Sequence, residues 1–348
     1  MAPKIPLLEL PEDVTRKILG YLDFLAILNL HKTCHDLRNF INNLRPPSLV
    51  YGIKIEMRPE EISLTLNFDP VYHPYEEMKN YTIRYTPYIS GVLVKYRLKS
   101  YLDQKMKILK NCDLLTIFSK DLEVILKLQK TVLRYFDLHF LYPKHEKKRK
   151  IFKVFEAIQN SQQTEIKEYT LKSKEIEVTC QGEHEVLEIV PFFDPKVLEV
   201  LKIDVGKQKA RLELQELIYL EQWENSKEVV LIGCTSVPER FQNFEKVEIS
   251  IQVLTQDDVF GFKEIFLQHP TQYLIQLHFQ HYYSENELLE VMGAPVIETD
   301  MYETRKWKVW WLRAAGERAV KLELHDDSLV MTKMKMVHVP GGVELVDA

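Results

Sequence analysis

The residue types that most often hold metals or carry out redox chemistry are sparse and widely spaced in this sequence. The four cysteines are Cys34, Cys112, Cys180 and Cys234. No two of them are close enough in the sequence to suggest a zinc site or a redox pair. His31 and His35 lie one helical turn apart with Cys34 between them, but the sequence places no fourth ligand nearby. We therefore expect free thiols, no metal and no other cofactor.

Short catalytic motifs are also missing. The sequence has 11 glycines, of which only Gly341 and Gly342 are adjacent. It contains no GxGxxG, GxxxxGKS/T, GxSxG or HExxH motif, each of which holds a phosphate, a nucleophile or a zinc ion. The absence of these motifs disfavours a nucleotide-dependent enzyme or a common hydrolase. An enzyme without a short signature motif is also disfavoured. We expect a protein that is not an enzyme.

Composition and charge are those of an ordinary globular protein. The 348 residues are 45% hydrophobic and 28% charged, and the formal net charge is −5. This balance gives no overall attraction to nucleic acid or to an anionic membrane. The first residues reach Glu9 and Glu12 without an apolar run, and no stretch approaches the roughly 18 apolar residues of a membrane span. We expect a cytoplasmic or nuclear protein.

The first 45 residues have the pattern of a helical module. Pro11 suits the first position of a helix, Glu12 and Asp13 follow at the positive end of the helix dipole, and Gly20 provides a stop. Asp23 can cap a second helical stretch. One apolar stripe runs through that stretch at Ile27, Leu30, Cys34, Leu37 and Ile41. Off the stripe lie Phe24, Leu25 and Leu28. The module therefore has more apolar surface than about 40 residues can bury alone.

The order and spacing of these residues resemble the F-box. The resemblance is carried by Leu8–Val14 (LELPEDV), Ile18–Asp23 (ILGYLD), Asn29–Leu30 and Cys34–Arg38 (CHDLR). In that family three helices dock onto the Skp adaptor, which connects to a cullin scaffold. The resemblance implies that the adaptor contacts and the core of the module are formed by Leu10, Pro11, Val14, Ile18, Leu22, Leu30 and Cys34.

Two positions depart from the F-box pattern. Ala26-Ile27 stands where many members have aspartate-leucine, and His35-Asp36-Leu37 replaces arginine-x-tryptophan. These departures weaken the match of the third helix more than that of the first two. The alternative is that residues 7–41 form an ordinary helical hairpin packed on the rest of the chain.

The middle of the chain has the period-two pattern of strands. Arg45–Ser48 (RPPS) breaks the helix, after which Ile53–Met57 and Ile62–Phe68 alternate around a turn at Arg58–Glu61. Tyr81–Tyr85 and Val92–Leu98 indicate a second pair of strands. The many tyrosines of this region do not share one parity, which favours a small antiparallel sheet over a tyrosine-rich binding face.

The middle segment ends with helical character and then a charge run. Asp121–Leu126 has a helical pattern, and Pro143 ends it. Lys144–Lys150 (KHEKKRK) is the most basic run of the chain. It could be a nuclear address or a phosphate-binding patch, but the sequence shows no second basic cluster to support binding. A solvated helix start leading into Ile151 is the favoured interpretation.

One short pattern recurs in the C-terminal half: apolar, two residues, apolar, one residue, apolar. Its copies begin at Leu198, Val229, Phe244 and Leu274, with a weaker copy at Ala319. The pattern is typical of the strand of a leucine-rich repeat. Helical stretches at 212–223, 256–267 and 285–291 separate most copies, which predicts a largely parallel sheet with helices on one face. The uneven spacing indicates a repeat-like fold and not a regular solenoid.

Side-chain alternation along these strands predicts an open sheet face that could bind another protein. The candidate target-binding residues on it are Lys202, Asp204, Leu231, Glu248, Ser250, Gln276 and His278. The alternative is a solvated face or one covered by another element. Trp307, Trp310 and Trp311 lie in a strand-like run, and we expect at least two of them in the core.

Part of this half also resembles the FTH region, an F-box-associated region of large nematode F-box families. The resemblance is carried by Phe193–Ile203 (FDPKVLEVLKI), Glu221–Trp223 and Val247–Ile249, within roughly residues 160–300. It implies that this half captures a substrate protein and performs no catalysis.

The sequence therefore predicts an α/β protein with four segments. These are a three-helix F-box at residues 1–46, a β-rich and then helical middle segment at 47–145, an FTH or leucine-rich-repeat-like target-binding domain at 146–330, and a tail at 331–348. The leading hypothesis is a substrate-recognition adaptor of an SCF (Skp–cullin–F-box) ubiquitin ligase that bridges the Skp adaptor and an unidentified target protein. The alternative is a non-catalytic scaffold acting outside ubiquitination. Neither hypothesis needs a membrane or a nucleic acid.

Overall fold

The computed structural model describes residues 7–22, 24–44, 50–68, 80–98, 104–129, 131–141, 171–206, 212–235, 237–282, 285–301, 304–343 and 345–346. The basic run at 144–150 and the helix expected after it lie outside these ranges. The chain divides into two compact units, each described by itself below. Unit 1 comprises Met1–Ile176 with Phe192–Val197, and unit 2 comprises Glu177–Pro191 with Leu198–Ala348. No helix in the described ranges combines the length and apolar character needed to cross a bilayer.

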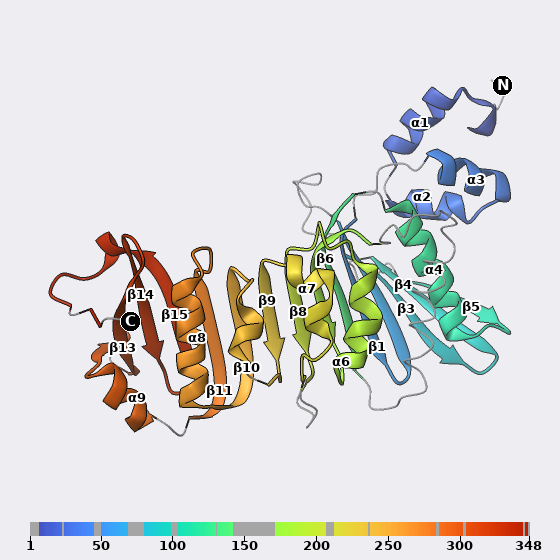
Figure 1. Ribbon diagram of the computed structural model, residues 1–348. Coiled ribbons are helices and arrows are strands. Elements are labelled where there is room, and N and C mark those ends of the chain that lie inside the picture. Colours follow the sequence, from blue (N-terminus) through green and yellow to red (C-terminus); the bar gives the residue numbers. More distant parts are fainter. Residues whose placement is uncertain are drawn as a thin grey trace. The chain divides into compact units, whose positions relative to one another are not determined.

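Unit 1 begins with a group of short helices (Figure 1). A 3₁₀ turn, η1 (Leu7–Glu9), precedes α1 (Glu12–Gly20), α2 (Phe24–His31) and α3 (His35–Leu44). Pro11 is the N-cap of α1, one position before the first helical position predicted for it, and Glu12 and Asp13 lie in the first turn as predicted. The continuous stripe expected from Ile27 to Ile41 is wrong, because Lys32–Cys34 separates α2 from α3. The two ends of the stripe, Ile27 and Ile41, are both buried.

The rest of unit 1 is a sheet with one covering helix. Its strands are β1 (Val50–Arg58), β2 (Glu61–Phe68), β3 (Asn80–Tyr88), β4 (Gly91–Leu98), β5 (Gln104–Lys110) and β6 (Leu133–Phe140). They lie in the order β6-β1-β2-β3-β4-β5, and all neighbours are antiparallel except β1 and β6. Both predicted strand pairs are confirmed. At the β3–β4 turn, Gly91 has φ +156°, and a Cβ there would meet the carbonyl oxygen of Leu109.

Helix α4 (Leu114–Leu128) confirms the predicted helical character at Asp121–Leu126. The predicted end at Pro143 is wrong, because the helix stops at Leu128 and Leu133–Phe140 forms β6. The side chain of Asp113 accepts a hydrogen bond from the backbone N–H of Thr116 (3.1 Å) and so caps the first turn of α4. Phe118, on the buried side of α4, meets the ring of Tyr85 on β3 at 5.7 Å between centroids. The helix therefore covers the face of the sheet to which Tyr85 points. We call the opposite face, on which Arg84 is exposed and Lys95 is half-buried, the open face.

Unit 2 is built around strands that follow β7 (Ser173–Thr179) in the chain. Its strands are β8 (Val200–Asp204), β9 (Glu228–Ile232), β10 (Lys246–Leu254), β11 (Leu274–Tyr282), β12 (Val296–Thr299), β13 (Lys306–Ala314), β14 (Arg318–Leu324) and β15 (Ser328–Lys335). The order is β8-β9-β10-β11-β15-β14-β13-β12. β8 to β11 are parallel, as predicted, and the remaining pairs are antiparallel.

The helices of unit 2 are α6 (Glu183–Ile189), α7 (Glu221–Asn225), α8 (Gln256–Gln268) and α9 (Glu285–Met292), with 3₁₀ turns η3 (Val190–Phe192), η4 (Leu217–Tyr219), η5 (Pro238–Phe241) and η6 (Met336–His338). Of these, α7 and α8 lie along one face of the parallel strands β8 to β11 (Figure 1). The expected helices at 256–267 and 285–291 are confirmed. The one at 212–223 is largely wrong: Leu214 has φ +56° and Leu220 is extended, so only η4 and α7 form.

The core of unit 2 is aromatic where α8 meets the preceding connection. Thr255 and Asp258 form a capping box at the start of α8. Phe262 packs on Phe241 with centroids 5.7 Å apart. A Cβ at Gly261 would lie 2.8 Å from Cγ of Pro238, so glycine permits the close approach of α8 to η5.

Two further predictions about this half are wrong. The weak pattern copy at Ala319 belongs to β14, which pairs antiparallel on both sides and is not a repeat strand. The expected tail at 331–348 begins inside β15, which continues to Lys335 and pairs with β14. As expected for at least two of the three tryptophans, Trp310 and Trp311 are buried.

Candidate functional site

The first candidate surface is one side of α1 and its flanking residues. Thr15 and Leu19 lie on the buried side of the helix, and the hydroxyl of Thr15 donates to the carbonyl of Leu7 or Pro11 (3.3 Å each). At about 100° per residue, Val14, Ile18 and the following Tyr21 point to an adjacent side. Val14 is 42% exposed and Tyr21 is 89% exposed. Apolar side chains on this side of α1 are therefore partly open to solvent.

The predicted adaptor-contact residues lie on or beside this side of α1. Pro11 and Val14 are exposed, and Leu10, Ile18 and Leu22 are half-buried. None of these five side chains is sealed inside unit 1. We call these five residues together with Tyr21 the α1 strip. Sequence reasoning missed Tyr21, although its spacing of seven residues from Val14 places it on the same side of the helix.

The two remaining predicted contact residues have different environments. Leu30 is half-buried at the end of α2. Cys34 is exposed between α2 and α3, and its Sγ accepts a weak hydrogen bond from the N–H of Leu37 (3.5 Å). Cys34 was expected to fill the core as part of the apolar stripe, and that expectation is wrong. The break between the helices turns the thiol outward, where it faces the first turn of α3.

A polar junction connects the short helices to α4. The ammonium of Lys32, just after α2, lies 2.8 Å from a carboxylate oxygen of Asp121 on α4. The other carboxylate oxygen of Asp121 accepts a hydrogen bond from the hydroxyl of Tyr85 (2.9 Å). The side chain of Asp121 is only 14% exposed, so both interactions are partly shielded from water. Burial beside this carboxylate raises the pKa of Tyr85 well above its ordinary value, so its hydroxyl keeps its proton.

The second candidate surface is the open face of the parallel strands in unit 2. One line of paired residues crosses β8 to β11 at Lys202, Val230, Glu248 and Gln276. The next line crosses them at Asp204, Ile232, Ser250 and His278. The intervening positions, such as Ile203 and Ile249, are buried toward the helices. We call these two lines the β8–β11 face.

Six of the seven predicted target-binding residues lie on the β8–β11 face and are half-buried, but Leu231 does not. Leu231 is fully buried, since it pairs with Ile203 and Ile249 on the helix side. The prediction for Leu231 is therefore wrong. Its neighbour Ile232 takes the outward position and is 44% exposed.

Charges on and beside the β8–β11 face partly neutralise one another. The ammonium of Lys246 lies 3.6 Å from the carboxylate of Glu228 and 3.9 Å from that of Glu248. Nε2 of His278 lies 3.9 Å from Glu248 on the neighbouring strand. Such exposed pairs contribute at most about 1 kcal/mol each. They fix the positions of the side chains across three strands and leave no strong charge of one sign.

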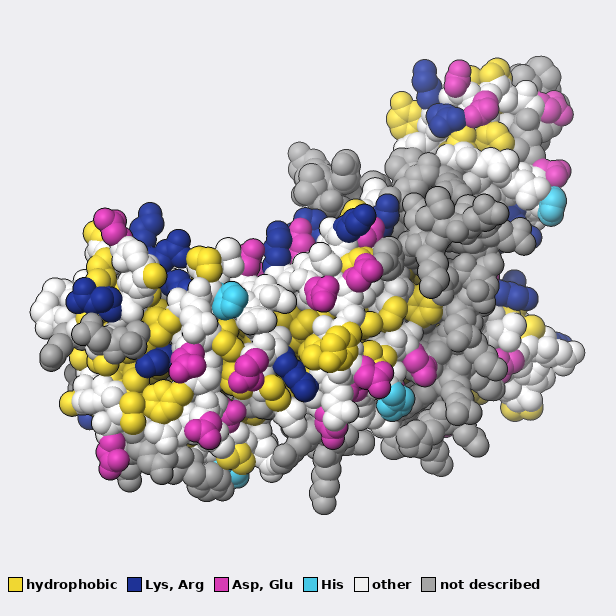
Figure 2. Space-filling model, in the orientation of Figure 1, with side chains coloured by type: hydrophobic (Ala, Val, Ile, Leu, Met, Phe, Trp, Pro, Cys, Tyr) yellow, Lys and Arg dark blue, Asp and Glu magenta, His cyan; other side chains and the backbone are white. Residues whose placement is uncertain are grey.

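The helix-bearing side of unit 2 has a different character. Figure 2 shows acidic, basic and hydrophobic side chains interspersed there, without a large patch of one charge. Within the described ranges, no three His, Cys, Asp or Glu side chains gather in a way that could hold a metal ion. All four cysteines are free, and burial raises the pKa of the Cys234 thiol to about 12. Cys234 is therefore a protonated, unreactive thiol at neutral pH.

Comparisons with known proteins identify two domains in the chain. A family model described as the F-box domain matches residues 7–49, which include α1 to α3. A second, described as the FTH domain, matches residues 149–295, which include β8 to β11. Neither the comparison with curated proteins nor that with solved structures returned a match. The chain is thus an F-box plus FTH family protein, with its F-box domain at residues 7–49 and its FTH domain at residues 149–295.

Proposed function

We propose that this protein is the substrate-recognition subunit of an SCF ubiquitin ligase. The F-box domain binds a Skp-type adaptor through the α1 strip, and the β8–β11 face of the FTH domain binds a target protein. An F-box domain supports a general role of this kind. The observation that carries the proposal is the apolar side of α1 that unit 1 leaves open, with Val14 42% exposed.

The physical reason for adaptor binding is the burial of apolar surface. Hiding a valine, isoleucine or leucine side chain from water contributes about 1.5–3 kcal/mol when the burial is complete. Val14 and Ile18 keep part of that gain available, because unit 1 covers them only in part. Tyr21 adds a ring with a polar tip, a side chain enriched among the residues that dominate binding energies. A partner helix or loop that covers the strip would realise this free energy.

The proposed mechanism is proximity. Holding the target and the ubiquitin-carrying enzyme in one assembly raises their effective concentration, so the target lysine meets activated ubiquitin without a chemical step on this chain. The protein then needs two binding surfaces and no nucleophile or base. The α1 strip and the β8–β11 face belong to the two matched domains and supply one surface each.

A substitution on the α1 strip tests this assignment. Val14→Glu combined with Ile18→Ala places a charge on the strip and shortens a half-buried side chain. We expect co-purification with a Skp-type adaptor to fall at least about tenfold, because the charge must lose its water on binding. The control is Glu12→Ala with Arg16→Ala, which removes an exposed ion pair (2.6 Å) on the other side of α1. Undiminished recovery with the first pair would contradict the proposal.

Target turnover separates the ligase role from the alternative of a scaffold outside ubiquitination. Proteins retained by the full chain while ligase activity is blocked would be identified first. Their half-lives would then be compared with the wild-type chain and with the Val14→Glu, Ile18→Ala variant. A ligase subunit predicts longer half-lives with the variant. A scaffold predicts equal ones.

A further inference from the structure

Strands β3 to β5 gather the strongest concentration of positive charge in the described part of unit 1. Residues 80–98 and 104–110 contain no aspartate or glutamate, although the whole chain has a net charge of −5. Their basic residues are Arg84, Lys95, Arg97, Lys105, Lys107 and Lys110. They are too scattered in the sequence to form a run, so the sequence alone gave no sign of a second basic cluster. This region lies outside both the F-box and the FTH match.

Four of these six basic residues have no ion-pair partner among the residues that the structure describes. Arg84 has Glu61 at 3.9 Å on the adjacent strand. Among the described residues, Lys95, Lys105, Lys107 and Lys110 form no ion pair. The four ammonium groups repel one another, and an acidic partner would reduce that repulsion.

The outer edge of β5 has unpaired backbone groups in the described sheet, where β5 pairs with β4 alone. The N–H of Asn111 donates to the carbonyl of Ser90 (2.8 Å), which continues the β4–β5 register by one pair. Hydrogen-bonded pairs alternate in an antiparallel ladder. Residues 105, 107 and 109 therefore point their backbone groups at β4, and Met106 and Ile108 point theirs away from it.

The two faces of this edge differ in chemistry. On the open face, Met106 is 65% exposed and Ile108 is 46% exposed. On the α4-facing side, Lys105 and Lys107 pair with Tyr96 and Val94 of β4 and are themselves exposed at the edge. Side chains of a strand alternate between its two faces. In a strand added to β5, every second residue would therefore lie beside Lys105 and Lys107, and the residues between them would lie beside Met106 and Ile108.

We propose that the edge of β5 binds an extended protein segment that alternates acidic and apolar residues and joins the sheet as an added strand. Main-chain hydrogen bonds from Met106 and Ile108 would supply affinity, and carboxylates opposite Lys105 and Lys107 would supply specificity. Lysines on an edge strand also hinder pairing between copies of the same chain. That role alone leaves the exposure of Met106 and Ile108 unexplained.

The direct test is a nine-residue peptide of alternating glutamate and valine, labelled and titrated with the full chain by fluorescence anisotropy. We expect saturable binding that weakens as salt is raised. Two kinds of matched peptide serve as controls. The first carries N-methyl groups on alternate backbone amides, in two versions that methylate either the odd-numbered or the even-numbered residues. The second has the same composition, with all the glutamates in one block. Both should bind at least about tenfold more weakly, since they lose the ladder or the alternation. Equal binding of all three would overturn the proposal.

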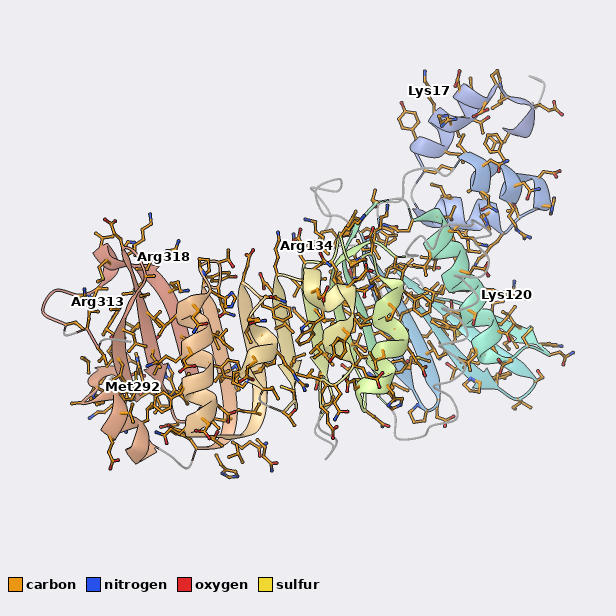
Figure 3. The ribbon with its side chains drawn as sticks, in the orientation of Figure 1. Lys17, Lys120, Arg134, Met292, Arg313 and Arg318 are labelled. Atoms are coloured by element: carbon orange, nitrogen blue, oxygen red, sulfur yellow. The ribbon has the colours of Figure 1, made fainter. Side chains whose placement is uncertain are left out.

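Variants of the chain locate the site. Lys105→Glu with Lys107→Glu should weaken peptide binding at least about tenfold, because two attractive cross-strand pairs become repulsive. The control is Lys120→Glu with Lys227→Glu, which changes the net charge by the same amount away from β5. Both lysines are exposed, and Lys120 projects from α4 (Figure 3). If both double variants lose the same peptide affinity, the loss reflects net charge alone and contradicts the proposal.

A second pair of variants separates backbone from side chain. Ile108→Pro removes an amide that points away from β4 and so spares the β4–β5 ladder. It should abolish peptide binding, and Ile108→Ala should only reduce it. Urea unfolding checks that each variant stays folded. The same titration is run with an RNA oligonucleotide and with phosphatidylserine vesicles. If either binds more tightly than the peptide and loses binding in the Lys105→Glu, Lys107→Glu variant, the proposal of a protein segment is wrong and that ligand is the partner.

Discussion

The α1 strip and the β8–β11 face present opposite kinds of surface. On α1 the outward residues are apolar, with Val14 42% and Tyr21 89% exposed. On the parallel strands the outward residues are mostly polar, and Glu248 lies near both Lys246 and His278. The first surface can bind by hiding apolar area, and any partner of the right shape gains from it. The second can only select a partner whose polar groups match its pattern.

This difference agrees with the division of work proposed for the two domains. A constant adaptor needs a surface that supplies free energy, and a selected target needs a surface that discriminates. Substitutions on and beside the two surfaces test this contrast.

The largest effect is expected from two neighbouring residues of β9 that point to opposite sides of the sheet. Leu231→Lys places an ammonium among fully buried side chains and should lower the free energy of unfolding by at least about 3 kcal/mol. Ile232→Lys, on the β8–β11 face, should change it by less than about 1 kcal/mol. Urea unfolding of both variants measures the difference. Equal losses would mean that the parity assigned to β9 is wrong.

Tyr21→Ala should separate binding from stability on α1. The ring is 89% exposed, so its loss should change the free energy of unfolding by less than about 0.5 kcal/mol. Adaptor affinity should fall about tenfold, as expected of a tyrosine within an interface. Calorimetric titration with a purified Skp-type adaptor measures the affinity. If Tyr21→Ala also lowered the free energy of unfolding, the ring would stabilise the fold, and its assignment to the α1 strip would be wrong.

The junction between the short helices and the sheet should give an intermediate effect. Asp121→Asn keeps the shape of the side chain but removes the charge beside Lys32 and weakens the bond to Tyr85. We expect a loss of about 1–2 kcal/mol in the free energy of unfolding, because both partners are partly shielded. Lys32→Met, at the more exposed end of the pair, should cost less than about 1 kcal/mol. A larger cost for Lys32→Met would reverse the roles assigned to these groups.

The smallest effect concerns pH and the end of α8. Nζ of Lys333 donates to the carbonyls of Phe266 and His269, 2.6 Å each, and burial lowers the pKa of Lys333 to about 8. The ordinary pKa is 10.5, so between about 8 and 10.5 the unfolded chain holds the proton that the folded chain has lost. Stability contributed by this group therefore rises with pH across that window. Urea unfolding at pH 7 and pH 9.5 should show a rise that Lys333→Met lacks. An identical pH dependence in both proteins would contradict it.

The register of unit 2 explains why one strand was assigned the wrong parity. Val200, Glu228, Lys246 and Leu274 lie on one line across β8 to β11. The buried residue two positions before each of them is Leu198, Ser226, Phe244 and Gln272. Ser226 and Gln272 are polar, so the apolar sequence pattern could not begin at them. Its copies in β9 and β11 were therefore placed too late, beginning at Val229 and Leu274. In β9 the shift exchanged Leu231 and Ile232, whereas in β11 Gln276 and His278 still point outward.

Buried polar residues can occupy these positions because the backbone satisfies them. The hydroxyl of Ser226 donates to the carbonyl of Gln222 (2.6 Å). The side-chain amide of Gln272 donates to the carbonyls of Phe241 and Phe244 (3.2 and 3.0 Å). Such tertiary contacts leave no mark in the local sequence pattern. The alternation in β1 and β2 and the start of α1 near Pro11 depend on near neighbours, and these were predicted from the sequence.

Hydrogen exchange of the full chain, with and without a Skp-type adaptor, tests the central claim most directly. The account predicts slower exchange at residues 10–22 on adding the adaptor, and no change across β8 to β11. Unchanged exchange at residues 10–22 under saturating adaptor, or protection confined to unit 2, would contradict it.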